Sequence, residues 1–401
     1  MKKKVLWISY YVPYDTVPHA GGKNHNFHLK SAQKSGLFDI HLISLGYEHE
    51  INKVDLDKYH IKNTIGIIPE DFFHKTINRF VNFNADINPF APYCGFFRQY
   101  KFFYNALKQY KLINCNPDII ILQWTQVVLL VPYIKELFPQ CKLVAIEEDV
   151  SFLGLERQYI YEKNPYLKWL YKLRFKKLKK LELDALAQCD LVFVNNLKDK
   201  KLLLGNNFSL DKVHIIPIYY DSYFTLKHSY NSNNILFFGA MRRKENHLSA
   251  MWFIKNVMPY LPENITFTIV GSNPRKSLLK LQNSRINITG FVNDVSQYFE
   301  NCLCSVAPLV LGAGIKVKIL ETLSAGVPVL TNYIGIEGIP AKNEVDYYHC
   351  ESPNDYISTI NKIYNNRDIL TDISNNARHL MLSEFNKETR MSEVLSLIKS
   401  L

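Results

Sequence analysis

One stretch of the sequence combines glycines, lysines and a glutamate at spacings that suit a phosphate ligand. It reads Pro308-Leu-Val-Leu-Gly-Ala-Gly-Ile-Lys-Val-Lys-Ile-Leu-Glu-Thr-Leu-Ser-Ala-Gly-Val-Pro-Val-Leu-Thr. Gly312 and Gly314 permit a tight loop whose backbone N–H groups can approach a ligand closely. A helix that starts near Lys316 adds free N–H groups and the positive end of its dipole, both of which favour a phosphate. The stretch therefore predicts a phosphate-binding loop.

Two further side chains extend this chemistry. Lys318 adds a second positive charge beside Lys316. Glu321 falls about one and a half turns into the helix, too far along to act as an N-terminal cap. A carboxylate beside a phosphate cradle suits a ribose diol, because it can accept hydrogen bonds from two hydroxyl groups.

Three adjacent acids, Glu147, Glu148 and Asp149, end a predicted strand in the first half of the chain. Ligands of doubly wound sheets bind at the carboxyl ends of strands, so a carboxylate here could bind sugar hydroxyls or act as a base. An acidic strand end or a helix N-cap explains these acids equally well. Gln123 and Trp124 end the preceding strand and could face an acceptor, although packing would also account for Trp124.

Metal sites and disulfides are not predicted. His19, His25 and His28 invite a metal interpretation, but no carboxylate nearby completes such a site. The seven cysteines are odd in number and include no Cys-x-x-Cys pair, which favours reduced thiols. Cys302 and Cys304 read as alternating residues of one strand.

Strands alternate with helices along the chain, which predicts parallel sheets. The expected strands are 5–10, 39–45, 118–124, 142–148 and 190–196, followed by 234–240, 265–271, 286–291, 302–308 and 327–332. Helices are expected at 24–35, 98–111, 246–258, 316–325 and 353–364, with a closing helix at 387–400. The polar stretch 214–234 reads as the join between two doubly wound halves.

Composition limits the possible classes of protein. The chain has 401 residues, 47% hydrophobic and 21% charged, which excludes a wholly disordered chain, a fibrous repeat and a disulfide-rich miniprotein. Its net charge of +11 favours contact with phosphates, nucleic acids or anionic lipids. We recognise no nucleic-acid-binding module. No apolar run reaches the length of about 18 residues that a membrane-spanning helix needs.

One segment is unusually basic. Between Lys168 and Lys180, seven of thirteen residues are Lys or Arg, and apolar residues recur every three or four positions. This spacing predicts an amphipathic helix. The helix either packs on the core with a solvated basic face or lies on anionic lipid.

The stretch that starts at Pro308, together with Gly335-Ile-Glu-Gly338, resembles the donor-binding signature of family 4 glycosyltransferases (group 1 glycosyl transferase domain). Weaker similarities are Gly21-Gly22, Asp149-Val-Ser-Phe, Phe238-Gly-Ala-Met241, Ile269-Val-Gly271 and Thr289-Gly-Phe-Val292. The resemblance implies an α/β protein with the GT-B fold, in which two Rossmann-like doubly wound domains face a central cleft. Residues 1–220 would bind the acceptor, with a helix at about 385–401 packing back on them, and residues 221–384 would bind the nucleotide-sugar donor.

The resemblance implies a retaining, metal-independent transferase (EC 2.4) of the hexosyl or N-acetylhexosaminyl type. It would use a nucleotide sugar, with a UDP-sugar favoured, and no cofactor. Its product would belong to a bacterial cell-surface polysaccharide or glycolipid, built on a glycan or lipid-linked acceptor. The chain would be cytoplasmic or peripheral on the inner face of the cell membrane, where 167–181 would contact anionic lipid. Two alternatives stay open: a non-catalytic nucleotide-sugar- or glycan-binding partner of another transferase, and a GT-B-fold nucleotide-sugar epimerase.

The resemblance also assigns roles to residues on the donor side. The residues that would bind the donor are Gly22, Arg243, Lys244, Gly312, Gly314, Ile315, Lys316, Lys318 and Glu321. Lys318 is the preferred charged contact and Glu321 the ribose ligand. A solvated basic loop is the alternative for Arg243 and Lys244. Ala313 stands where the family has the first glutamate of its Glu-x7-Glu motif.

On the acceptor side, Glu148 stands where the family often has a histidine. Glu148 and Asp149 are the predicted catalytic residues, and Gln123 and Trp124 would contact the acceptor.

Overall fold

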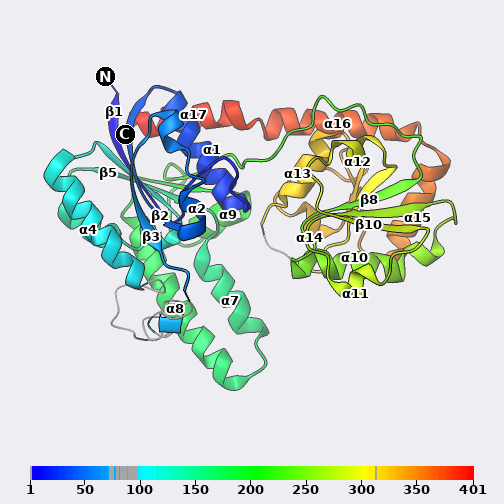
Figure 1. Ribbon diagram of the computed structural model, residues 1–401, viewed down its shortest axis with the longest axis horizontal. Coiled ribbons are helices and arrows are strands. Elements are labelled where there is room, and N and C mark those ends of the chain that lie inside the picture. The colour runs from blue at the N-terminus through cyan, green and yellow to red at the C-terminus, as the bar shows by residue number, and fades with distance from the viewer. Residues whose placement is uncertain are drawn as a thin grey trace. The chain divides into compact units, whose positions relative to one another are not determined.

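The computed structural model describes residues 2–71, 76, 77, 81, 88, 97–114, 116–311 and 314–401. The chain divides into two compact units, shown in Figure 1. Unit 1 comprises Met1–Tyr219 and Lys387–Leu401, and unit 2 comprises Tyr220–Asn386. The chain therefore passes from one unit to the other twice.

Unit 1 is built on a seven-stranded parallel sheet with the strand order β3-β2-β1-β4-β5-β6-β7. Its strands are β1 (Lys3–Ser9), β2 (Phe38–Tyr47), β3 (Lys62–Ile68), β4 (Ile119–Gln123), β5 (Lys142–Glu147), β6 (Leu191–Val194) and β7 (Val213–Ile215). The sequence did not predict the two edge strands. β3 is only partly buried and β7 has three residues, so neither carries the long apolar run of a central strand.

Helices cover both faces of this sheet. They are α1 (Ala20–Lys34), α2 (Glu48–Ile51), α4 (Phe97–Asn114), α5 (Thr125–Val128), α6 (Val131–Leu137), α7 (Ser151–Tyr161), α8 (Pro165–Ala187), α9 (Leu197–Leu204) and α17 (Lys387–Ser400), with a 3-10 turn η1 (Leu56–Tyr59). Side chains of β1 alternate between two cores. Trp7 packs with Leu29 of α1 and Leu395 of α17, whereas Leu6 packs with Leu107 of α4.

Unit 2 is built on a six-stranded parallel sheet with the order β10-β9-β8-β11-β12-β13. Its strands are β8 (Asn234–Phe238), β9 (Thr266–Val270), β10 (Ile286–Gly290), β11 (Cys304–Ala307), β12 (Val329–Thr331) and β13 (Tyr348–His349). Its helices are α10 (Lys244–Asn256), η2 (Met258–Tyr260), α11 (Lys276–Leu279), α12 (Ser296–Glu300), α13 (Val317–Ser324), α14 (Tyr333–Ile336), α15 (Pro353–Asn365) and α16 (Ile369–Glu384).

A long helical hairpin, α7–α8, leads away from the sheet of unit 1 (Figure 1). α8 contains the basic segment 168–180 and extends it at both ends. Its start is fixed by Asn164, whose side-chain oxygen accepts the N–H groups of Tyr166 and Leu167. None of the helices in the described ranges is both long and apolar enough to cross a bilayer.

The strand order reverses once in each sheet, between β1 and β4 in unit 1 and between β8 and β11 in unit 2. In doubly wound sheets, ligands bind outside the carboxyl ends of the strands at such a reversal. Each unit therefore offers one edge where a site is expected.

Candidate functional site

In unit 1, a carboxylate is held by three amides at the carboxyl ends of neighbouring strands. Glu148, directly after β5, accepts a 2.7 Å hydrogen bond at Oε1 from Gln123 Nε2. Its Oε2 accepts bonds of 2.8 Å from Asn24 Nδ2 of α1 and from Asn195 Nδ2 after β6. A carboxylate has about four lone-pair sites, so these three donors leave one for a ligand. We name Glu148 and its three amide partners the Glu148 cluster.

The environment of Glu148 makes its carboxyl group a proton acceptor near neutral pH. Burial raises the pKa of Glu148 to about 7, and the charge of Asp149 acts in the same direction, while the three amide hydrogen bonds lower it. A general base works best when its pKa lies near the operating pH. The cluster therefore has both the geometry and the titration range of a general base.

Trp124 lies near this carboxylate, is 8% exposed and belongs to the hydrophobic core of unit 1. Its φ of 77° is left-handed, which is an outlier for a bulky side chain. The indole packs edge-on against Tyr11 and His25, with ring centroids 5.2 and 5.1 Å away. A Cβ placed on Gly21 would lie 3.5 Å from Trp124 Nε1 and 3.6 Å from Glu148 Cγ. Backbone strain of this kind is concentrated at functional sites.

The two other residues predicted in unit 1 lie close to the cluster. Asp149 is exposed and adjoins Glu148. Gly22 is buried in the first turn of α1, where its N–H donates to His19 Nδ1 at 2.9 Å. A Cβ there would come within 2.4 Å of a neighbouring side chain, so packing requires this glycine. Gly21, rather than Gly22, is the glycine that adjoins the Glu148 cluster.

Two of the histidines considered as metal ligands, His25 and His28, lie inside unit 1. His25 and His28 are buried in α1, and His28 Nε2 lies 2.8 Å from the carbonyl oxygen of Pro217. Burial lowers the pKa of His28 to about 4. Among the residues that the structure describes, no group of three or more His, Cys, Asp or Glu side chains is arranged to hold a metal ion.

Two more buried carboxyl groups lie around the end of β5. Thr125 Oγ1 donates to Glu147 Oε2 at 2.6 Å. Glu182 of α8 accepts the backbone N–H groups of Ser151 and Phe152, at 2.8 and 3.0 Å. Burial raises the pKa of both glutamates. Glu182 thus caps the N-terminus of α7 and ties α8 to the end of β5.

In unit 2, Lys318 and Asn246 meet at the strand-order reversal. Lys318 Nζ donates to Asn246 Oδ1 at 2.8 Å and lies 4.5 Å from the centroid of the Phe237 ring. Asn246 Nδ2 donates in turn to the Ala240 carbonyl at 3.0 Å. Gly239 has a φ of 147°, and a Cβ there would come within 2.8 Å of the Asn246 amide. Asn246 therefore joins the loop after β8 to helix α13.

Lys318 is poised to gain charge when an anion approaches. Burial lowers its pKa to about 7, and the positive charge of Arg243 acts in the same direction. Arg243 precedes α10 and pairs with Glu245 at 2.5 Å, whereas Lys244 is exposed. A nearby phosphate would favour the ammonium form of Lys318. The structure thus brings Arg243 close enough to Lys318 to influence its charge.

The residues before α13 form the described part of the predicted phosphate loop. Gly314 has a φ of 67°, and Lys316 Nζ hydrogen-bonds its carbonyl oxygen and lies 3.6 Å from Glu337. Ile315 packs against the core under α13. The N-cap residue Lys316 makes no side-chain capping bond to α13, and the N–H of Ile319 already donates to the Lys316 carbonyl oxygen at 2.8 Å. A ligand could therefore meet the N–H groups before Ile319. Gly312 and the adjoining alanine lie outside the described residues.

Glu321 lies three residues after Lys318, on the same side of α13. The side chain is buried, and its charge adds to the effect of burial in raising the pKa of Tyr223. The N–H of Tyr223 donates to Ser324 Oγ at 3.0 Å. This bond holds the segment around Tyr223 against α13, next to the predicted ribose ligand.

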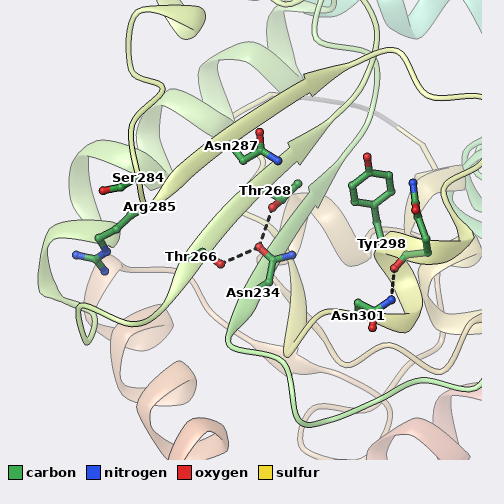
Figure 2. A pocket seen from close by; sticks show the side chains of 9 residues that line it. Asn234, Thr266, Thr268, Ser284, Arg285, Asn287, Tyr298 and Asn301 are labelled. Atoms are coloured by element: carbon green, nitrogen blue, oxygen red, sulfur yellow. Dashed lines mark hydrogen bonds between the residues drawn. The ribbon is translucent and has the colours of Figure 1, made fainter.

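A cavity of about 470 Å³ lies at the opposite, amino-terminal end of the strands of unit 2. Figure 2 shows Asn234 at its centre, where Oδ1 accepts hydrogen bonds from Thr266 and Thr268. Arg285 at its border donates to the carbonyl oxygens of Ile265 and of residues 261 and 262. These polar groups hold strand ends together, and the cavity contains none of the predicted site residues.

The sequence did not identify as site residues the asparagines that bond Glu148 in unit 1 and Lys318 in unit 2. Asn24 follows the Gly21-Gly22 motif, Asn195 lies within the predicted strand 190–196, and Asn246 follows the Phe238-Gly-Ala-Met241 motif. Nothing in the pattern showed which carboxylate or amine they contact. Tyr11 and Gly21 were missed as neighbours of Trp124. A signal was present, since polar residues directly after a buried strand of a parallel sheet share one edge.

The comparisons with known proteins bear on both units. Residues 232–366, within unit 2, match the model of the family described as glycosyl transferases group 1. No curated protein matches the sequence. Three of the similar solved structures are HepE of Anabaena in complex with UDP, the sucrose-phosphate synthase of Thermosynechococcus elongatus and a glycosyltransferase of Rickettsia africae.

These structures are similar to the whole chain. HepE has a TM-score of 0.66 at 12% identity, with 100% of each chain covered. The synthase has a TM-score of 0.66 at 13% identity, covering 100% of this chain and 99% of the other. The Rickettsia protein has a TM-score of 0.60 at 17% identity, covering 100% and 98%. The fold is GT-B. The prediction of a GT-B fold is thereby confirmed, and the family match supports a place among group 1 glycosyltransferases.

Proposed function

We propose that this chain is a glycosyltransferase that takes a sugar from a nucleotide-sugar donor. The observation that carries the proposal is the Lys318–Asn246 pair at the strand-order reversal of a unit that matches group 1 glycosyltransferases. The charges of Lys318 and Arg243 and the uncapped start of α13 would together stabilise a diphosphate, both bound and departing. Because these groups belong to the chain itself, we propose a transfer that needs neither a metal ion nor a cofactor.

The favoured donor is a UDP-sugar. HepE, which shares the fold, has been solved with UDP and with UDP-glucose. In this chain Glu321 would accept the ribose hydroxyls, and the N–H groups near Gly314 and Ile315, with Lys316, would contact the phosphates. Phe291 follows β10 at the same carboxyl edge and is 71% exposed, so its ring is available to stack on the base.

Unit 1 would bind the acceptor and receive its proton. The remaining lone pair of Glu148 would accept the hydrogen of the acceptor hydroxyl, and the exposed Asp149 would keep the pKa of Glu148 raised. Gln123 would position Glu148, and Trp124 would pack against the apolar face of a sugar. The Glu148 cluster favours an enzyme over a non-catalytic binding partner, because such a partner has no need of a base.

The finer parts of the proposal concern the reaction and its setting. We infer a retaining transfer of a hexosyl or N-acetylhexosaminyl group, in which Glu148 takes the acceptor proton and the negative charge of the departing diphosphate assists that transfer. The acceptor would be a glycan or a lipid-linked glycan in bacterial cell-envelope polysaccharide or glycolipid synthesis. The chain would work in the cytoplasm, at the inner face of the cell membrane.

The test is a panel of nucleotide sugars incubated with the purified chain and a bacterial lipid extract, with release of nucleoside diphosphate as the readout. Glu321→Ala and Lys318→Ala are run beside the wild type, with Lys280→Ala, an exposed lysine of unit 2, as the matched control. We expect release with one donor, lost in the first two variants and kept in the third. Release that survives both substitutions would contradict the assignment of the donor site.

A further inference from the structure

The tip of the α7–α8 hairpin exposes an unusual concentration of large apolar side chains. Five lie within ten positions, on the last residues of α7 and the first residues of α8: Ile160, Tyr161, Tyr166, Leu167 and Trp169. Tyr161 is 80% exposed and Trp169 53%. In the rest of the described chain, exposed large hydrophobic residues occur singly or in adjacent pairs. Clusters of exposed apolar side chains on a protein surface mark sites where a protein or a membrane binds.

The surface around this tip is strongly positive. Residues 156–181 hold nine basic and two acidic side chains. Within the described chain, Lys163, Lys168, Lys172 and Lys176 form no ion pair. Lys168 and Lys172 instead lie 5.7 and 5.8 Å from the centroid of the Tyr159 ring. Their charge is therefore available to an external anion.

The apolar side of α8 itself is already occupied. Leu178 belongs to the core of unit 1, and Phe175 and Leu181 pack against that core. The sequence left open whether this helix packs on the core or lies on lipid, and for its apolar side the structure shows core packing. The tip, whose apolar residues face solvent, is the part of the hairpin that can meet a partner.

We propose that the hairpin tip, residues 159–172, docks on an anionic lipid bilayer. Tyr161, Tyr166 and Trp169 would enter the interface between headgroups and acyl chains, where aromatic rings are enriched in membrane proteins. Lys168 and Lys172 would lie against the anionic headgroups. The inference rests on the proposed function only in taking the membrane as the place of the acceptor.

The positive charge of the tip favours an anionic membrane over a second copy of the chain as the partner of this surface. A symmetric contact between two copies would bring two strongly basic surfaces together, and their repulsion opposes association. A leaflet rich in anionic lipid carries a negative surface potential, which attracts the same residues. The aromatic tip and its basic surroundings are therefore complementary to an anionic membrane surface.

Trp169 provides a direct measurement. The other three tryptophans, Trp7, Trp124 and Trp252, are more buried. Vesicles of phosphatidylglycerol and phosphatidylcholine, with and without brominated acyl chains, are titrated into the full-length protein. We expect a blue shift of the tryptophan emission and quenching by the brominated lipid. Trp169→Phe should abolish both signals while the protein still sediments with the vesicles.

Two sets of variants test the two parts of the surface. The triple substitution Tyr161→Ser, Tyr166→Ser and Trp169→Ser should lower the vesicle partition constant at least tenfold, whereas Tyr260→Ser, at an equally exposed tyrosine of unit 2, should leave it unchanged. Replacing Lys168, Lys172 and Lys176 by Gln should lower it about fivefold per lysine, because each nearby basic residue contributes about that factor. The matched control replaces Lys53, Lys58 and Lys280, which are exposed elsewhere.

Three results would overturn the proposal. The first is binding to neutral and anionic vesicles with equal affinity. The second is quenching that persists in Trp169→Phe. The third is a dimer in sedimentation velocity that the triple serine variant dissociates, since this would assign the tip to a second copy. Vesicle binding requires no donor, so its failure is distinguishable from a failure of sugar transfer.

Discussion

The side-chain amide of Gln123 donates a 2.7 Å hydrogen bond to Oε1 of Glu148. This bond joins the carboxyl ends of β4 and β5, two neighbouring strands of the sheet in unit 1. Asn24 and Asn195 hold the second oxygen, so the orientation of the carboxylate is fixed before any substrate arrives. Pre-oriented groups of this kind lose little freedom at the moment of reaction.

The first prediction concerns the pH dependence of transfer. The pKa of Glu148 is raised to about 7, so the basic, ionised form is lost as the pH falls through 7. Sugar transfer should therefore decline on the acidic side with a midpoint near pH 7. Glu148→Gln should remove this limb and lower turnover by about 10²- to 10⁴-fold. Initial rates between pH 5.5 and 9 provide the measurement.

The melting temperature of a Glu148 variant distinguishes a catalytic role of Glu148 from a purely structural one. A carboxyl group with a raised pKa in the folded state favours folding below its unfolded pKa, and this advantage is lost as the pH rises through 7. Glu148→Gln should thus raise the melting temperature at pH 8. Glu156→Gln on α7 is the control and should change neither the acidic limb of the pH profile nor the melting temperature. A fall in the melting temperature of Glu148→Gln at pH 8 would assign the residue to structure alone.

The second prediction concerns proton uptake in unit 2. Lys318 has its pKa lowered to about 7, and a bound diphosphate favours the charged amine, so binding should take up a proton above pH 7. Affinity for UDP-glucose, whose phosphates do not titrate in this range, should fall between pH 7 and 9. Lys318→Arg should abolish this dependence, and Lys318→Met should weaken binding about tenfold to a hundredfold. Calorimetry in buffers of different ionisation enthalpy tests it, and an unchanged proton count in Lys318→Arg would refute it.

The third prediction contrasts two glycines. Gly314 has a φ of 67°, so Gly314→Ala should cost about 1–2 kcal/mol of stability and weaken donor binding. Gly154 lies on the exposed side of α7 with open space around it, and Gly154→Ala should stabilise the chain by up to about 1 kcal/mol. Chemical denaturation measures both changes. Equal effects of the two substitutions would argue against a special conformation at Gly314.

The fourth prediction concerns Trp124. Trp124→Phe should raise the acceptor KM several-fold, because the ring that packs beside Glu148 becomes smaller. Binding of UDP-glucose should stay the same, since the predicted charged and ribose contacts, Lys318 and Glu321, belong to unit 2. Trp252→Phe, a half-buried tryptophan of unit 2, is the matched control and should leave the acceptor KM unchanged. A loss of donor binding in Trp124→Phe would contradict the division of roles between the units.

The central strands and several of the longer helices could be predicted because their apolar runs and their spacing are local properties of the sequence. β5 and β8 lie within the expected ranges, and α17 occupies the residues expected for the closing helix. The edge strand β3 and the short β13 could not be predicted, because an edge strand is buried on fewer sides and carries a weaker pattern. α16 was not predicted either, although its apolar residues recur at helical spacing.

The residues of the candidate sites also differ in how far the sequence could predict them. Glu321, Lys318 and the glycine loop stand in one continuous stretch, so the sequence alone could group them as candidates. The Glu148 cluster joins Glu148 to partners that are 25 to 124 positions away, and only the folded unit brings them together. Lys318 could be named as a charged contact, but its partner Asn246 lies 72 residues away. Contacts of this length are set by tertiary packing, which a pattern in the chain does not encode.

The packing of α17 on unit 1 has a consequence for the order of synthesis. Leu395 and Ile398 belong to the core that also contains Trp7 and Leu29. Residues 387–401 leave the ribosome only after all of unit 2, whereas the sheet they cover is complete by residue 215. At about 5–20 residues per second, that apolar face waits on the order of ten to thirty seconds for its last helix. The unit made second can therefore finish folding first, and the nascent first unit is the one that chaperones would be expected to shield.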